Sequence, residues 1–164
     1  MTLSSPAKRA TQYSAANLFL DNQLCFALYS ASLAMTKVYR PLLTPLGLTY
    51  PQYLVMLALW EHRELSAGAL GERVALDSGT LVPLIRRLQR MGLVDRRRST
   101  IDDRSVLVSL TTAGRRLSKR AHSVHDQAAC STGRSAGERR ALTQNLQTLR
   151  RSLLQTVMPT RHND

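Results

Sequence analysis

The segment from Asp77 to Leu110 constrains the fold of this chain more than any other stretch. Apolar residues recur there at helical spacing and make one narrow stripe, which predicts a short amphipathic helix from Ser78 to Met91. The residues of the stripe are Leu81, Leu84, Ile85, Leu88 and Met91. Gly92 then ends the helix, and the runs LVDRRR and SVLVSL around STIDDR indicate two strands joined by a charged tip. The segment therefore predicts a helix followed by a β-ribbon.

The face of this helix opposite the stripe carries small residues near the helix start and arginines further along the helix. At 100° per residue it carries Gly79, Pro83, Arg86 and Arg90, with Thr80 and Arg87 on its flank. A helix with such a face fits the major groove of DNA, and a basic ribbon can reach the adjoining backbone. A charge run is often only a solvated face, but here cations gather on both the helix and the ribbon, which favours DNA.

Different parts of this surface are expected to contact different parts of a duplex. Small polar residues at the helix start lie where base edges would be read, whereas arginines hold phosphates. The residues expected at base edges are Ser78, Gly79, Thr80 and Pro83. The arginines expected to contact DNA are Arg86, Arg87 and Arg90 on the helix and Arg97 and Arg98 on the ribbon.

The charge balance favours the same class of partner. The chain has 164 residues, enough for one domain with a core, and 23 Lys and Arg against 11 Asp and Glu give a formal net charge of +12. A field of that sign attracts polyanions; nucleic acid is the commonest, and an acidic membrane surface is the rival. The longest apolar run, Tyr53 to Trp60, is far shorter than the roughly 20 residues that cross a bilayer. The residues after Lys8 and Arg9 are too polar for a signal peptide, so a cytoplasmic location without permanent disulfides is expected.

The segments before the ribbon predict an arm and three further elements. Residues 1–20 lack clear periodicity and are expected to form a flexible arm. A helix begins at Asp21, which is placed to cap it, and Pro41 should bend or end it. Its apolar face consists of Leu24, Leu28, Ala31, Met35, Val38 and Leu42. Thr49 and Gln52 form a capping box that opens a buried helix from Tyr50 to about residue 61.

The next residues complete a helix-turn-helix and lead to two helices beyond the ribbon. HREL is expected to be a turn, and Ser66 caps a short helix to about residue 75. Thr111 can cap a helix from Thr112 towards Cys130, and a second capping box, at residues 135 and 138, opens a last helix. The apolar stripe of this last helix consists of Leu142, Leu146, Leu149, Leu153 and Val157.

These elements predict a mostly α fold with a small β-ribbon. Residues 49–111 are expected to form the DNA-binding lobe, and residues 21–48 and 112–158 a helical dimerisation region. A lone terminal helix with an apolar stripe needs a partner surface, and a second copy of the chain is the economical choice.

Several separate segments resemble one family. The runs NQLCFALYSASLAMTKVYRPLL, LGLTYPQYLVMLALWE and LDSGTLVPLIRRL, with the D-x-R-S pattern of Asp102 to Ser105, closely resemble the OhrR-type organic-hydroperoxide repressors of the MarR family. The resemblance covers roughly residues 20–130. It implies a winged helix-turn-helix homodimer that represses a gene for peroxide detoxification and leaves its DNA, expected to be a pseudo-palindromic operator, when a cysteine is oxidised.

The resemblance also implies roles for particular residues. Cys25 matches the reactive cysteine of the family, and Tyr39 and Tyr50 match the tyrosines that support it. Cys130 resembles the resolving cysteine of the two-cysteine branch, which implies a sulfenic acid at Cys25 and then an intersubunit disulfide. Arg104, paired with Asp102, matches the wing arginine that enters the minor groove.

Plain readings of both cysteines compete with these roles. Without the resemblance, Cys25 would be read as an inert core thiol and Cys130 as an incidental helix-end residue. Tyr39 lies fourteen positions after Cys25, about 21 Å along one straight helix. If Tyr39 supports Cys25, it must therefore come from the other subunit.

Other functions find less support in the sequence. His122, His125 and Cys130 suggest a metal site at first glance, but no carboxylate or further thiol completes it, so no metal or cofactor is expected. No Ser-His-Asp arrangement or phosphate-binding glycine loop is visible, and we expect no enzyme activity. The rivals are a MarR-type repressor released by a small aromatic ligand and a thiol peroxidase, although a peroxidase has no evident use for the ribbon arginines.

Overall fold

The computed structural model describes residues 18–98 and 105–157. It confirms the mostly helical fold with a small antiparallel sheet. In chain order the elements are η2 (Leu20–Asn22), α1 (Leu24–Leu43), η3 (Thr44–Leu46), α2 (Tyr50–His62), β1 (Glu64–Ser66), α3 (Ala67–Val74), α4 (Ser78–Arg90), β2 (Val94–Arg98), β3 (Val106–Leu110), α5 (Thr112–Cys130) and α6 (Ala136–Val157).

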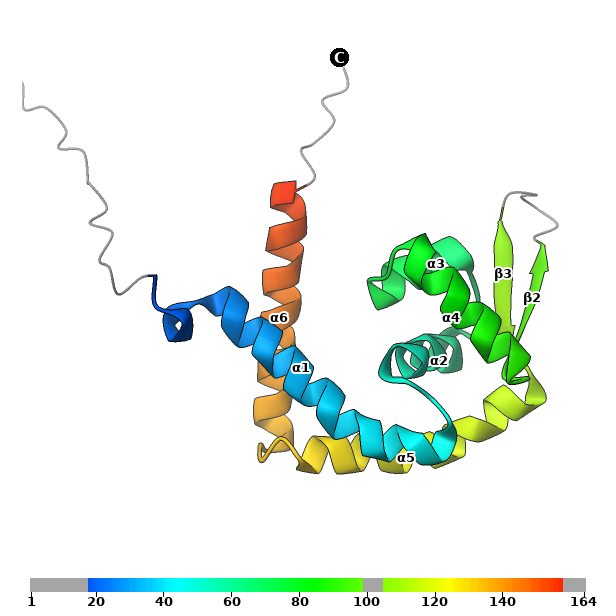
Figure 1. Cartoon of the computed structure of the whole chain (residues 1–164), viewed down its shortest axis with the longest axis horizontal. Coiled ribbons are helices and arrows are strands. Elements are labelled where there is room, and N and C mark those ends of the chain that lie inside the picture. The colour runs from blue at the N-terminus through cyan, green and yellow to red at the C-terminus, as the bar shows by residue number, and fades with distance from the viewer. Residues whose placement is uncertain (1–17, 99–104, 158–164) are drawn as a thin grey trace, which may run out of the picture.

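Helix α2 lies at the centre of the lobe, as its apolar sequence predicts. Tyr53, Val55, Met56 and Leu59 are buried on several sides of the helix, because α3, α4, α5 and the sheet all pack around it (Figure 1). Leu81, Ile85 and Leu88 of α4 are buried in the same core. The predicted α4 stripe is narrower than its sequence indicates, because Leu84 is only half-buried and Met91 is exposed.

The sheet contains one strand more than the sequence predicts. Its order is β1-β3-β2, all antiparallel, and β3 lies in the middle. The predicted turn in HREL is wrong over its last residues, since Glu64 to Ser66 pair with Ser109 to Leu107 of β3. Three residues carry too little periodicity to reveal a strand whose partner lies more than 40 residues away.

The predicted helix starts are confirmed by their hydrogen bonds, with one exception. The Thr49 N–H donates to Gln52 Oε1 at 2.9 Å, and the Ser66 hydroxyl accepts from the N–H of Ala69. The Thr111 hydroxyl accepts from the Gly114 N–H, and Ser135 and Glu138 exchange bonds as a capping box.

The exception is the first helix. Asp21 does not cap it, because residues 20–22 form a 3₁₀ turn and α1 begins only at Leu24, behind Gln23. Pro41 does not stop α1 at once, since the helix runs two residues further to Leu43. A proline in the last turn removes a single helical donor, so its cost there is smaller than in mid-helix.

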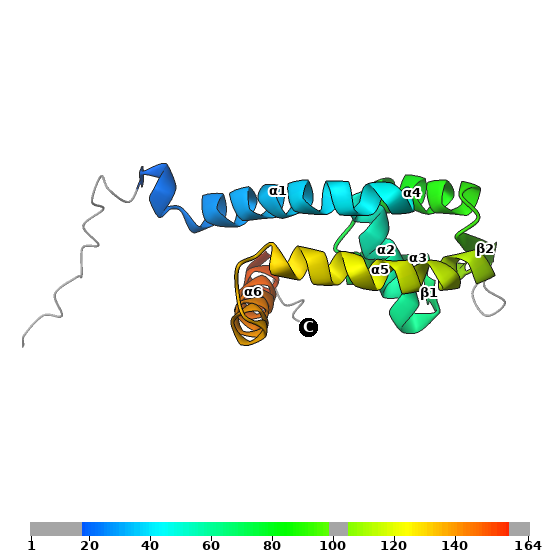
Figure 2. The same cartoon turned by 90° about the horizontal axis from the view of Figure 1, so that it is seen from below.

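Helices α1, α5 and α6 extend beyond the lobe. α1 and α5 both run away from it and contact each other, and α6 turns sharply off the end of α5 (Figures 1 and 2). α6 has no buried residue, and Leu142 and Leu153 of its stripe are 46% and 54% exposed. Within the described residues no single helix is long and apolar enough to cross a membrane; only α1 with η3 and α2, as a pair bent by 71°, reaches that length and composition.

Candidate functional site

Helix α4 presents the surface that its sequence predicts. All seven residues expected to contact DNA from this helix are exposed, on the side away from the buried stripe. They are Ser78, Gly79, Thr80, Pro83, Arg86, Arg87 and Arg90. Pro83 lies inside the helix without interrupting it, and the residue whose carbonyl its ring crowds is Gly79.

Asp77 organises the start of α4, a role that the sequence analysis missed. Its Oδ1 accepts the Thr80 N–H and its Oδ2 accepts the Thr80 hydroxyl, both at 2.9 Å. The backbone hydrogen bond from Thr80, with help from the hydroxyl, holds the pKa of the Asp77 carboxyl below its usual value. An aspartate directly before the first residue of an amphipathic helix was the available signal.

The wing places Arg97 and Arg98, its two described arginines that are expected to contact DNA, in different surroundings. Arg98, at the end of β2, is exposed. Arg97 makes a two-point ion pair with Glu64 of β1: Nη2 lies 2.9 Å from Oε1 and Nε 3.3 Å from Oε2. Asp102 and Arg104, expected at the wing tip, lie outside the described residues.

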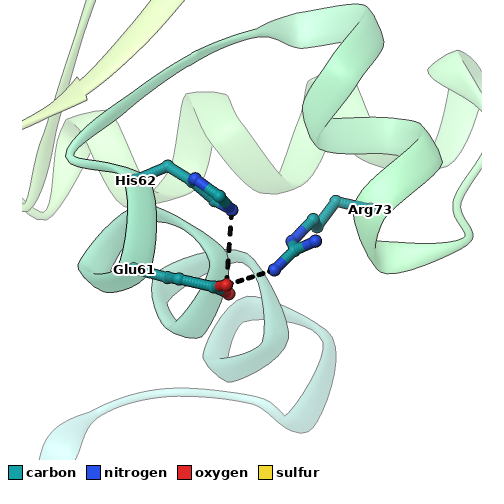
Figure 3. Close-up of polar contacts among 3 residues, drawn as sticks. All are labelled: Glu61, His62 and Arg73. Carbon is teal, nitrogen blue, oxygen red and sulfur yellow. Dashed lines mark hydrogen bonds and ion pairs between the residues drawn. The ribbon is translucent and has the colours of Figure 1, made fainter.

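A second ion pair joins the core helix to the helix-turn-helix. Arg73 of α3 donates to Glu61 Oε1 at the end of α2, and His62 Nε2 lies 3.6 Å from the same oxygen (Figure 3). The hydrogen bond from Arg73 lowers the pKa of the Glu61 carboxyl. Arg73 is thus a cation of the lobe that positions α3 against α2.

The base of the wing is a close backbone junction. Gly114, in the first turn of α5, packs against the Leu93 peptide so tightly that a Cβ there would overlap the Leu93 carbonyl. The indole N–H of Trp60 donates to the Gly114 carbonyl at 2.9 Å, and the Thr111 hydroxyl donates to the Gly92 carbonyl at 2.7 Å. The end of α4, the wing and α5 are therefore fixed to one another at this point.

Both thiols are exposed in the single chain. Cys25 is the second residue of α1, and Cys130 is the last residue of α5. Cys25 is therefore not a core thiol of its own chain. It lies in the first turn of α1, where backbone N–H groups have no acceptor within the helix.

The two tyrosines that resemble the family's supporting pair lie together, far from Cys25 of the same chain. Tyr39 and Tyr50 have ring centroids 4.8 Å apart, and Tyr53 lies 5.6 Å from Tyr39. Burial, followed by repulsion from neighbouring tyrosines, raises the pKa of Tyr39 and raises that of Tyr53 to about 12. Because Cys25 and Tyr39 lie on one α-helix, fourteen residues separate them by about 21 Å. If Tyr39 or Tyr50 supports a Cys25, it must therefore be the Cys25 of another chain.

An apolar groove lies between α1 and α6. It encloses about 610 Å³ and is lined by Leu28, Ala31 and Met35 on one side and by leucines of the α6 stripe on the other. In the part of the chain described here, no group of three His, Cys, Asp or Glu residues could hold a metal ion. His122 instead contacts the Ser118 carbonyl through Nδ1 at 2.8 Å.

Known proteins share both the sequence and the fold. The family described as transcriptional regulator SarA/Rot matches residues 37–121, more than half of the chain. The organic hydroperoxide resistance transcriptional regulator of Bacillus subtilis is 54% identical over 102 residues, which cover 62% of this chain and 69% of that protein. The transcriptional regulator TtmR of Methylorubrum extorquens is 47% identical over 134 residues, which cover 82% of this chain and 69% of TtmR.

Solved structures agree with these sequence relatives. AbfR of Staphylococcus epidermidis superposes with a TM-score of 0.69 and 31% identity, covering 83% of this chain and 94% of AbfR. AbfR has also been solved in a reduced form bound to DNA and in a disulfide form. With its winged helix-turn-helix lobe, its flanking helices and these relatives, the chain belongs to the SarA/Rot group of MarR-type transcriptional regulators and is of the OhrR kind.

Proposed function

We propose that this transcriptional regulator is a homodimeric repressor that binds a pseudo-palindromic DNA operator and releases it when an organic hydroperoxide oxidises Cys25. The DNA half of the proposal is supported by the exposed face of α4 and by the exposed Arg98 at the end of the wing strand β2. The similar protein AbfR, which binds DNA in its reduced form, supports the same assignment.

The sensing half depends on chemistry at two thiols. The Cys25 thiolate attacks the outer oxygen of the hydroperoxide, which breaks the O–O bond; with one proton taken up, the products are Cys25 sulfenic acid and an alcohol. The thiol of Cys130 from the partner chain then attacks the sulfenic sulfur, and water leaves as the disulfide forms. The hydroperoxide is reduced and the two thiols are oxidised, so no cofactor is required.

The observation that carries this proposal is the placement of Cys25 and Tyr39 at opposite ends of one helix. The tyrosine pair cannot reach the cysteine of its own chain, but two antiparallel α1 helices would bring each pair to the partner's Cys25. A tyrosine hydroxyl that donates a hydrogen bond to the thiolate would stabilise its charged form. The sensor and the dimer interface are then one structure.

The dimer itself is supported by the uncovered apolar faces. The α6 stripe and the groove beside α1 are too apolar to remain in water, and a second copy would bury both. Sedimentation of the reduced protein at micromolar concentration should give a dimer, and a stable monomer would contradict the proposal.

Cysteine variants test the sensing mechanism. A duplex selected from a random library by the reduced protein is labelled, and its binding is followed by fluorescence anisotropy during titration with cumene hydroperoxide. The wild type should lose the duplex, whereas Cys25→Ser should bind it and keep it. Cys130→Ser is the matched control: it should form a sulfenic acid that dimedone traps, but no covalent dimer on a non-reducing gel.

The outcomes separate this proposal from its rivals. If Cys25→Ser releases DNA as the wild type does, Cys25 is idle and release by a small aromatic ligand becomes the better account. If the wild type gives a disulfide monomer instead of a covalent dimer, the intersubunit scheme is wrong. Steady consumption of hydroperoxide with a thiol reductant would favour a peroxidase.

A further inference from the structure

Among the arginines in and beside the DNA-binding lobe, some bond to the protein and others do not. Arg73, Arg97 and Arg115 each donate to an acceptor of the protein: Glu61, Glu64 and the Leu110 carbonyl. Arg86, Arg87, Arg90 and Arg98 are exposed, and no ion pair joins them to a carboxylate within the described residues. Within residues 18–98 and 105–157, Arg97 is the one predicted DNA contact that a carboxylate holds.

The pair between Glu64 and Arg97 spans the whole width of the sheet. Glu64 lies on β1 opposite Ser109, Arg97 lies on β2 opposite Leu107, and the two side chains meet across the middle strand β3. Two bonds from one guanidinium to one carboxylate fix the direction of the Arg97 side chain. The side chains are 36% and 55% exposed, so a phosphate in solution could compete for Arg97.

Arg97 lies where such competition would matter. It is the next-to-last residue of β2, and the free ends of β2 and β3 lie on the same side of the lobe as the start of α4 (Figure 1). A duplex seated on α4 would therefore pass close to Arg97. Glu64 also lies two residues before Ser66, which caps α3, so the pair ties the wing to the first helix of the helix-turn-helix.

We infer that Glu64 is a positioning residue that holds Arg97 along the sheet and withholds its charge from the DNA backbone. The wing then contacts DNA through its other basic residues. The ion pair of Arg97 with Glu64 fixes the orientation of the wing relative to the helix-turn-helix. The carboxylate limits the affinity for arbitrary sequence, because each added phosphate contact strengthens non-specific binding regardless of base order.

The salt dependence of binding to an arbitrary duplex tests this inference. Each phosphate contact contributes about 0.9 to the slope of log affinity against log salt concentration. Wild type and Arg97→Gln should share one slope because, contrary to the expectation from the sequence, Arg97 contacts no phosphate in the wild type. Glu64→Gln frees Arg97 and should steepen the slope by about 0.9, so that its affinity falls about 3.5-fold more than that of the wild type between 0.05 and 0.2 M salt. The double variant should return to the wild-type slope.

Glu72→Gln is the matched control. Glu72 is exposed on α3 of the same lobe and makes no ion pair within the described residues, so this change adds the same net charge without freeing an arginine. The inference is overturned if Glu64→Gln and Glu72→Gln share one slope, or if Arg97→Gln alone lowers the slope by about 0.9. It rests on the DNA-binding part of the proposed function but not on operator choice or oxidation, so a protein that ignores hydroperoxide can still pass this test.

Discussion

Substituting Gly114 tests whether the close junction at the wing base is as tight as its geometry indicates. A Cβ at Gly114 would lie 2.0 Å from the Leu93 carbonyl oxygen and 3.2 Å from the Leu110 Cδ2. Because Cβ atoms essentially never come closer than 3.0 Å to another heavy atom, the first turn of α5 or the Leu93 peptide must move by about 1 Å or more. Overpacking of this kind costs about 1–3 kcal/mol, and Gly114→Ala lies at the upper end because the Leu93 peptide, being backbone, cannot rotate away as a side chain could. Alanine regains up to about 1 kcal/mol in a helix, which leaves a net loss of about 2 kcal/mol.

Urea unfolding of the reduced protein measures this loss. Trp60 is the one tryptophan of the chain and donates to the Gly114 carbonyl, so its fluorescence reports on the junction itself. With a slope of about 2 kcal/mol/M, the midpoint should fall by about 1 M at a fixed chain concentration. Gly68→Ala is the control, because Gly68 is also in a first helical turn but a Cβ there meets nothing within 4 Å. Equal or greater stability of Gly114→Ala than of wild type would refute the reasoning.

Three further predictions concern single side chains. Trp60→Phe keeps the aromatic contact but loses the hydrogen bond to Gly114, and circular dichroism should show a loss of about 1 kcal/mol in unfolding free energy. The folded-state pKa of the Glu61 carboxyl lies below its usual value of 4.5. Its contribution to stability is therefore complete above pH 4.5 and is lost as the pH falls through the folded-state pKa. The stability of Glu61→Gln should thus change less with pH below 4.5 than that of the wild type, and an unchanged acid unfolding transition would contradict this. Asp77→Ala removes the cap of α4 and should lower the urea unfolding midpoint, whereas Asp77→Asn should keep most of the cap; equal unfolding midpoints for the two variants would show that the cap is unimportant.

Local signals in the sequence were enough to predict most helices. Thr49, Ser66, Thr111 and Ser135 cap the helices that follow them, because a cap depends only on residues within one turn. Gly92, with φ of 68°, ends α4 for an equally local reason. Asp21 shows the limit of such reasoning: a capping residue type is present, but the backbone around it forms a 3₁₀ turn instead.

Features that join distant segments could not be predicted in the same way. Strand β1 exists only because β3 pairs with it, and the Glu64–Arg97 ion pair joins residues 33 positions apart. Tyr39 and Tyr50 were named through a family resemblance, whereas their contact depends on how α1 meets α2. The exposed face of α4 could be predicted, since helical periodicity alone determines which side turns away from the core.

The leucines that α6 leaves in water also bear on the life of a newly made chain. A copy that has not yet met another exposes the α6 stripe and much of α1, which is the kind of surface that chaperones hold and proteases cut. In the proposed homodimer a second copy covers this surface, so survival after synthesis would depend on an encounter that becomes rarer as the chain becomes scarcer. The abundance of a chain with this proposed dimer should therefore fall more steeply than its rate of synthesis.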